Sequence, residues 1–168
     1  MKRASLDDRT FEDAVRQHGA MVARIVSTYE VRPALAEELV QDVFTALWRA
    51  LPAFRGDSSL KTFVARIAHN VSISHVRKEV RMRHVELDDA MPAHADGPHE
   101  ETERNLARER LLQAVRRLPL GQRRVVSLHL EGFANKDIAQ VLDLSEGNVA
   151  VRLNRARGAL TDLMGGVR

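Results

Sequence analysis

The sequence of 168 residues contains no cysteine, and only 4% of its residues are aromatic. Without cysteine the chain has neither disulfides nor cysteine-ligated zinc sites, which fits a reducing compartment. No apolar run approaches the roughly 20 residues that a membrane-spanning helix needs. No apolar segment follows the basic pair Lys2-Arg3 either, so a signal peptide is not expected. We therefore predict a cytoplasmic protein without membrane insertion.

Motifs of catalytic and metal sites are also missing. The seven histidines are scattered, and no two have the His-Glu-x-x-His spacing that places two zinc ligands on one helix face. There is no nucleophile elbow and no glycine-rich loop of the kind that binds phosphates. We expect no enzyme activity, no catalytic residue, no metal and no cofactor.

Aliphatic residues instead recur at helical spacing along most of the chain. A first helix is expected around Phe11 to Tyr29, and a second begins at Pro33, because proline suits the first turn of a helix. A third runs from Leu60 to Arg83, and further helical segments follow Leu106. No segment alternates as a strand would. The pattern predicts an all-α fold whose first three helices form a bundle.

Charge divides this helical chain into parts. Residues 66–83 hold five lysines and arginines and one acid, whereas residues 85–103 hold seven acids and no lysine or arginine. The acidic stretch also contains Pro92, Gly97 and Pro98, a composition typical of linkers. We predict an N-terminal helical bundle domain (residues 1–83), a flexible acidic linker (84–104) and a C-terminal helix-turn-helix domain (105–168).

The helix-turn-helix is predicted from two helical segments that are separated at Asp143-Leu144-Ser145. Ser145 is the expected N-cap of the last helix. If Val149, Leu153 and Ala156 are buried, polar and cationic residues lie on the opposite side, where they can enter a major groove. These are Asn148, Val151, Arg152 and Arg155, with Arg157 at the flank. The alternative is a basic helix that faces only solvent.

The outer side of the third helix is also basic and polar. It carries Lys61, Arg66, His69, Asn70, Arg77, Lys78 and Arg81. Such a surface suits phosphate contacts. An arginine-rich helix surface without a ligand fits the same pattern.

Motifs in the two halves resemble one known family. The segment Ala36–Phe44 (AEELVQDVF), followed by Leu47-Trp48-Arg49, resembles the polymerase-binding helix of extracytoplasmic-function (ECF) sigma factors. The segments 54–63 and 66–70 resemble the promoter-melting part of that family, and 118–157 resembles its C-terminal helix-turn-helix. The ordered set covers nearly the whole chain outside the predicted linker.

The resemblance implies a sigma factor that binds core RNA polymerase and directs promoter recognition, DNA melting and transcription initiation. Its implied partners are the β′ clamp helices and β flap of the polymerase, promoter DNA and an anti-sigma factor. The implied polymerase contacts are Leu39, Val40, Gln41, Asp42 and Phe44. The implied minus-ten contacts are Arg55, Ser58, Lys61, Arg66, Asn70, Arg77 and Lys78. The implied minus-thirty-five contacts are Asn148, Val151, Arg152, Arg155 and Arg157.

The chain departs from the family pattern at several positions. Phe63 replaces a usual tryptophan, and Ser74 a usual acid. Ala134 replaces a usual serine or threonine cap, so Asn135 is expected to cap one residue later, and Asp143 stands at the turn glycine. Ala150-Val151 replaces a usual Lys-Ser pair, which leaves the promoter preference open.

Two other functions are compatible with parts of this pattern. A helix-turn-helix regulator that acts without polymerase would need the C-terminal half alone. A sigma-like decoy would bind polymerase or a regulator and no promoter. The segment from Glu38 to Phe44 argues against the first, and the arginines of the last helix argue against the second.

Overall fold

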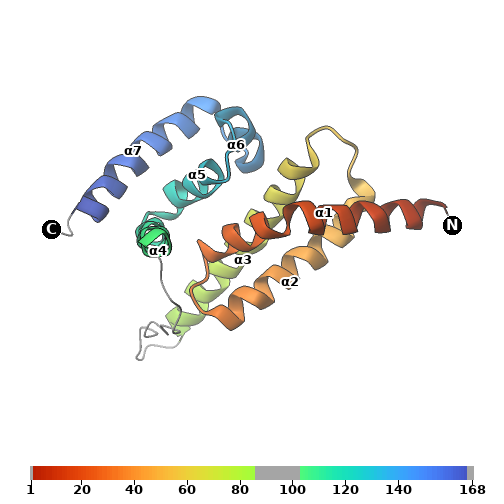
Figure 1. Ribbon diagram of the computed structural model, residues 1–168, viewed down its shortest axis with the longest axis horizontal. Helices are drawn as coiled ribbons and strands as arrows, with labels where there is room; N and C mark the ends of the chain where they lie inside the picture. The colour runs from red at the N-terminus through yellow and green to blue at the C-terminus, as the bar shows by residue number, and fades with distance from the viewer. Residues whose placement is uncertain (1, 86–102, 166–168) are drawn as a thin grey trace.

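The computed structural model describes residues 2–85 and 103–165 of the chain (Figure 1). Within these ranges there are helices and no strand, so the all-α prediction is confirmed. The α-helices are α1 (Lys2–Ser27), α2 (Pro33–Ala50), α3 (Leu60–Val85), α4 (Glu103–Arg116), α5 (Leu120–Leu130), α6 (Asn135–Leu142) and α7 (Glu146–Gly165). A short 3-10 helix, η1 (Leu51–Ala53), follows α2.

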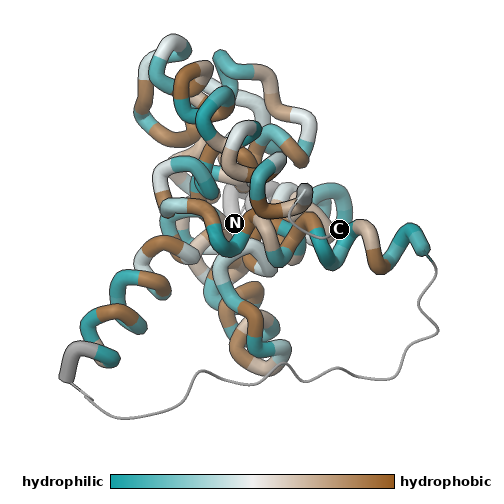
Figure 2. The backbone as a smooth tube through the Cα atoms, turned by 90° about the vertical axis from the view of Figure 1, so that its left-hand side faces the viewer, coloured by the Kyte–Doolittle hydropathy of each residue, from teal (hydrophilic) through white to brown (hydrophobic). Residues whose placement is uncertain are grey.

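Helices α1, α2 and α3 form the N-terminal bundle, whose core is aliphatic. Val22 of α1, Val43 and Leu47 of α2, and Val64 and Ala68 of α3 are fully buried. Figure 2 shows polar and apolar residues alternating along the helices, because each helix buries one side only. No helix in the described part of the chain is both long and apolar enough to cross a membrane.

Local capping explains where the helices of the bundle begin. Pro33 is the first residue of α2, as predicted. The Ser59 hydroxyl accepts a hydrogen bond from the backbone N–H of Thr62 at 3.1 Å and so caps α3. Helix α3 continues to Val85 and α4 begins at Glu103, so both ends of the predicted linker are helical. The rest of that predicted linker, 86–102, lies outside the described residues.

Helices α4 to α7 form the C-terminal half, in which α6 and α7 make the helix-turn-helix. Asp143 adopts a left-handed conformation (φ 54°, ψ 52°) at the turn, which aspartate tolerates better than most residues other than glycine. The prediction that Asn135 caps α6 is wrong. Asn135 is already the first residue of the helix, and Ala134 at the cap position provides no side-chain hydrogen bond.

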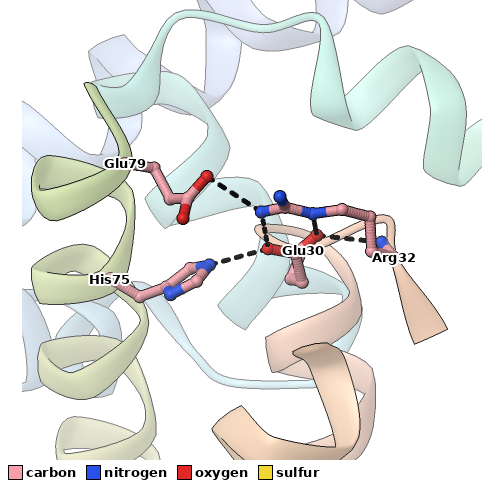
Figure 3. A network of polar contacts seen from close by, with 4 residues as sticks. All are labelled: Glu30, Arg32, His75 and Glu79. Atoms are coloured by element: carbon pink, nitrogen blue, oxygen red, sulfur yellow. Dashed lines mark hydrogen bonds and ion pairs between the residues drawn. The ribbon is translucent and has the colours of Figure 1, made fainter. Parts of the chain in front are cut away.

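A polar network joins the turn after α1 to the side of α3 (Figure 3). Glu30 is 5% exposed, and its carboxylate accepts hydrogen bonds from the Arg32 guanidinium at 2.8 Å. The ring of His75 lies 2.7 Å from the same carboxylate, and Arg32 also donates to Glu79 at 2.9 Å. A buried carboxylate is stable only with such partners. The network therefore holds the α1–α2 turn against α3.

The network also determines the ionisation of Glu30. Burial raises the pKa of this carboxyl, but the hydrogen bonds from Arg32 and His75 outweigh burial and lower the pKa to about 2, from an ordinary value of 4.5. Because the folded-state pKa is depressed, this stabilisation is fully present above the unfolded-state pKa. It is lost as the pH falls toward 2.

We predict that Glu30→Gln lowers the free energy of unfolding at pH 7 by about 2–4 kcal/mol, since the charged partners lose their carboxylate. Urea unfolding followed by circular dichroism checks the value. The difference from the parent protein should shrink as the pH falls from 4.5 toward 2. The exposed Glu12 of α1 provides a matched Glu→Gln control. Equal losses at the two positions would contradict the assignment.

Candidate nucleic-acid and polymerase interfaces

Helix α7 is built to present a polar face. The Ser145 hydroxyl accepts a hydrogen bond from the backbone N–H of Asn148 at 3.1 Å, so the predicted cap is confirmed. Val149, Leu153 and Ala156 are buried, as the spacing required. Burial of this stripe turns the other predicted contacts toward solvent. Asn148, Val151, Arg155 and Arg157 are exposed, and Val151 is 50% exposed.

Arg152 differs from its neighbours because it is half-buried and already bonded. Its Nε donates to Oδ1 of Asn148 at 2.7 Å, and its Nη1 lies 3.5 Å from the carbonyl oxygen of Gly121 in α5. A Cβ atom at Gly121 would come within 3.0 Å of the same Nη1. The guanidinium is therefore oriented by Asn148 and lies against Gly121, a glycine outside the helix-turn-helix.

The predicted minus-ten residues lie on α3 and on the loop before it. Arg55 is exposed in that loop beside Gly56, which has a positive φ of 79°. The rings of Phe54 and Phe63 pack under the loop with centroids 4.7 Å apart, so Phe63 keeps an aromatic support there. Ser58 is half-buried. These contacts give the loop a fixed base from which Arg55 projects.

Farther along α3, Asn70, Arg77 and Lys78 are exposed. Arg66, Asn70 and Arg77 share one face of the helix by their spacing of four and seven residues. Lys61 and Arg66 are half-buried, because both contact the C-terminal half: Lys61 donates to the carbonyl oxygen of Glu131 at 3.0 Å and Arg66 to that of Gln140 at 2.7 Å. In the predicted minus-ten set, four side chains are exposed to solvent and two are hydrogen-bonded to the C-terminal half. The exposed ones are those of Arg55, Asn70, Arg77 and Lys78, and the bonded ones are those of Lys61 and Arg66.

His69 was expected on the polar outer side of this helix, and that expectation is wrong. The residue is fully buried between the two halves. Its Nδ1 lies 2.8 Å from the Tyr29 hydroxyl, and its Nε2 lies 3.4 Å from the Ser127 hydroxyl of α5. Burial, with a smaller contribution from the charge of Arg124, lowers the pKa of His69 to about 3. The neutral ring is a structural part of the interface between the halves.

Three of the five predicted polymerase contacts line a groove between α1 and α2. Val40, Gln41 and Phe44 line it together with Ala23, Ala36 and Glu37. Gln41 and Asp42 are exposed. Leu39 is 3% exposed and packs in the bundle core, so this member of the predicted set offers no contact surface. The remaining residues combine an apolar groove with an acidic and polar rim.

An aromatic cluster beside the groove was not predicted. The ring of Phe11 meets those of Phe44 and Trp48 edge to face, with centroids 6.5 and 5.2 Å apart. Trp48 is 46% exposed. The sequence placed Trp48 only within the polymerase-binding motif, and the packing of α1 shows that one side of the indole stays accessible. Exposed aromatic rings of this kind are common in protein interfaces.

Each half of the chain matches a known protein family. Residues 14–82 match the family Sigma-70 region 2, and residues 108–160 match Sigma-70 region 4. The ECF RNA polymerase sigma-E factor of Escherichia coli is 32% identical over 165 residues, which cover 92% of this chain and 86% of the relative. The chain belongs to the ECF sigma factor family. The RNA polymerase sigma factor NccH of Alcaligenes xylosoxydans is 28% identical over 97% of this ECF sigma factor and 91% of its own length.

Solved structures agree with this assignment. CnrH in complex with the cytosolic domain of CnrY is 25% identical, with a TM-score of 0.74 over 99% of this ECF sigma factor and 95% of CnrH. The sigma factor RpoE in complex with the anti-sigma factor NepR from Bartonella quintana is also 25% identical. Its TM-score is 0.77, over 94% of this ECF sigma factor and 97% of RpoE. The region 2 match supports a sigma factor over a regulator that needs only a helix-turn-helix.

The geometry around Arg152 generates a prediction about Gly121. Gly121→Ala should displace the Arg152 guanidinium and reduce discrimination between promoter variants at the minus-thirty-five element by about threefold to tenfold, part of the roughly 1–3 kcal/mol that a bidentate base contact is worth. The fold should persist, because alanine favours a helix more than glycine does. Transcription from a minus-thirty-five library, with thermal unfolding in parallel, measures both effects.

Gly158→Ala is the matched control. This glycine lies on α7 itself, and a Cβ there would meet nothing within 4 Å. The control should leave the promoter preference unchanged. If both variants alter the preference alike, Gly121 has no special role in placing Arg152.

Proposed function

We propose that this ECF sigma factor docks on core RNA polymerase through α2 and binds the two promoter elements through separate surfaces. The bundle domain (1–83) would contact the β′ clamp helices and the minus-ten element. The helix-turn-helix domain (105–168) would contact the β flap and the minus-thirty-five element. In this proposal the chain contributes binding and strand separation in the cytoplasm, and the polymerase contributes bond formation.

The α2 groove is the observation that carries the polymerase contact. It pairs an apolar floor, to which Val40 and Phe44 contribute, with the exposed polar side chains of Gln41 and Asp42. A helix of a partner would bury its apolar side chains in the groove and contact the rim through polar ones. The exposed Trp48 extends the apolar area beyond the groove.

The DNA contacts are supported by charge and exposure. On α7, the exposed Arg155 and Arg157 suit phosphates or base edges, and the Asn148–Arg152 pair presents an oriented guanidinium. Val151 is exposed where the family usually has a serine, and its methyl groups suit the methyl group of thymine. On α3, Asn70, Arg77 and Lys78 suit the backbone of a separated strand.

We also propose an anti-sigma partner for this chain. The support is that CnrH and RpoE, which share its fold over nearly the whole chain, were each solved with a partner, CnrY and the anti-sigma factor NepR respectively. The α2 groove and its aromatic neighbours are an accessible apolar surface that such a partner would cover.

Reconstitution with core RNA polymerase and sequencing of the transcripts tests the function directly. The parent protein should form a holoenzyme that initiates at defined promoters. Gln41→Ala combined with Asp42→Ala should weaken polymerase binding by about tenfold, since interface contacts of this kind are worth roughly 1–2 kcal/mol. Both side chains are exposed, so the bundle should stay folded. Normal holoenzyme formation by the double variant would place the docking surface elsewhere, and a parent protein that binds no core enzyme would refute the proposal.

Arg152→Ala tests the DNA-binding side separately. The change should cost about 1–3 kcal/mol of promoter binding and relax the preference at one minus-thirty-five position. Holoenzyme formation should be retained, because the change leaves the α2 groove, which carries the proposed β′ contact, intact. An unchanged transcript profile would show that Arg152 does not read the minus-thirty-five element.

A further inference from the structure

The two halves of the chain meet around a histidine ring. His69 of α3 is fully buried, although histidine is a residue that water usually reaches in part. The hydroxyl of Tyr29, in the turn after α1, lies 2.8 Å from its Nδ1, and the hydroxyl of Ser127, in α5, lies 3.4 Å from its Nε2. The N-terminal bundle therefore supplies one neighbour of the ring and the C-terminal half supplies the other. We call this packing of the halves the closed arrangement.

The hydrogen bonds around His69 fit a neutral ring. The Ser127 hydroxyl donates its hydrogen to the carbonyl oxygen of Arg124 at 3.0 Å, so toward His69 it accepts. Nε2 of the ring therefore carries the hydrogen, and Nδ1 accepts a hydrogen bond from the Tyr29 hydroxyl. A second proton would lie on Nδ1 and point at the Tyr29 O–H, which is itself a buried donor. One buried donor would then lack an acceptor, at a cost in free energy.

The charges on the C-terminal side also oppose a second proton. Arg124 of α5 is the charged group that acts on the His69 ring. Arg77 of α3 and Arg152 of α7 lie close enough to Arg124 to disfavour its charge, and Arg123 is its neighbour in the chain. A protonated ring would add one more positive charge to this group of cations.

The titratable groups on the α1 side do not offset that charge. The Tyr29 hydroxyl is neutral, because burial raises its pKa to about 12. Glu30 follows Tyr29 in the chain, but its carboxylate is already bonded to Arg32 and His75. The surroundings of His69 therefore stabilise the neutral ring from both halves.

We propose that the closed arrangement is sensitive to protons: it forms while His69 is neutral, and acidification opens it by protonating this ring. Ser127 and its neighbours cover the ring only while the halves are packed together, so opening gives the ring access to water. Water and a free hydrogen-bond acceptor would then stabilise the second proton. The proposal concerns the packing of the free chain and does not depend on the proposed polymerase or promoter contacts.

The pH range follows from the two states of the ring. A histidine in water has an ordinary pKa of 6.5, whereas burial, with a smaller contribution from Arg124, lowers the pKa of His69 to about 3 in the closed arrangement. Because the closed-state pKa is the lower one, closure is fully favoured above pH 6.5. Below that value its equilibrium constant falls about tenfold for each pH unit, until the pH reaches about 3. Glu30 stays ionised at pH 5.5, because its pKa is about 2.

Thiol labelling measures opening even when few molecules are open. The chain has no cysteine, so a single one introduced as Phe133→Cys reports on a buried position over which Lys61 of the other half lies. Ala150→Cys, at an exposed position of α7, gives the rate for an accessible thiol at each pH. The ratio of the two rates, measured with the full chain and dithiodipyridine, gives the open fraction. Circular dichroism at each pH checks that the helices persist.

We expect this ratio to rise about tenfold between pH 7.5 and pH 5.5 in the parent background. His69→Gln should remove the rise, because the amide donates and accepts hydrogen bonds but does not titrate. NMR signals of the histidine rings give a test that needs no closed variant. The protonated fraction of His69 should follow the open fraction as the pH falls to 4.5.

His129→Gln and His18→Gln are the matched controls. His129 is exposed at the end of α5, and His18 is a half-buried residue of α1 whose pKa is lowered by burial and by the charge of Lys61. Both variants should keep most of the rise. A ratio that does not change with pH in the parent background would overturn the proposal. So would a rise that His69→Gln leaves unchanged, an equal loss of the rise in a control, or a His69 ring that is protonated while the halves are closed. Loss of helix at pH 5.5 would show that acid unfolds the chain instead of opening it.

Discussion

Burial of one side of α3 is the constraint on which the other features depend. Val64, Ala65 and Ala68 pack in the aliphatic core, and Ser72 and Ile73 continue the buried side one turn later. A buried valine or isoleucine side chain contributes about 1.5–3 kcal/mol when it leaves water, and a single buried methyl group contributes about 0.8 kcal/mol. The rotation of the helix is thereby determined, and with it the outward direction of Arg66, Asn70 and Arg77. The Glu30 network adds a polar restraint to the same helix through His75 and Glu79.

Arginine serves two physical purposes in this chain. Some guanidinium groups are exposed on the side of α7 for which we propose DNA contacts, as those of Arg155 and Arg157 are. Others hold the two halves together: Arg116 donates to the carbonyl oxygen of Ser27 at 2.9 Å, and Arg24 pairs with Glu131. Burial lowers the pKa of Arg124, and the nearby charges of Arg152 and Arg77 lower it further. Cations of the two proposed promoter-binding surfaces thus lie close to one another in the closed arrangement.

That closeness has a consequence for promoter binding. Like charges repel one another when they approach, and Arg124 also loses part of its hydration at the interface. The interface compensates through neutral groups, among them the His69 ring between the hydroxyls of Tyr29 and Ser127. Binding DNA would relieve the repulsion, because phosphates are the natural counterions of such a surface. The closed arrangement is thus held by packing, hydrogen bonds and the Arg24–Glu131 ion pair, against the repulsion of Arg124 by Arg152 and Arg77.

Local chemistry was enough to predict much of this protein from its sequence. The bundle helices, the cap at Ser145 and the buried stripe of Val149, Leu153 and Ala156 were predicted, because they depend on interactions between residues a few positions apart. The matched motifs also gave the correct family. Helical periodicity, however, identifies which residues share a face and does not identify what covers that face.

The errors and omissions come from contacts over long separations. His69 was expected on the outer side of α3 and is buried by the C-terminal half. Leu39 was among the polymerase contacts implied by the family resemblance, and it packs in the core of the bundle. The hydrogen bonds of Lys61, Arg66 and Arg24 to the C-terminal half were not predicted, because they join residues 70 to 107 positions apart. The sequence by itself determined the helices, their polar faces and the family. Only the tertiary structure decided which cations face solvent and which are bonded to the other half. The reason is that this depends on how the two halves pack together, and each half could be predicted only by itself.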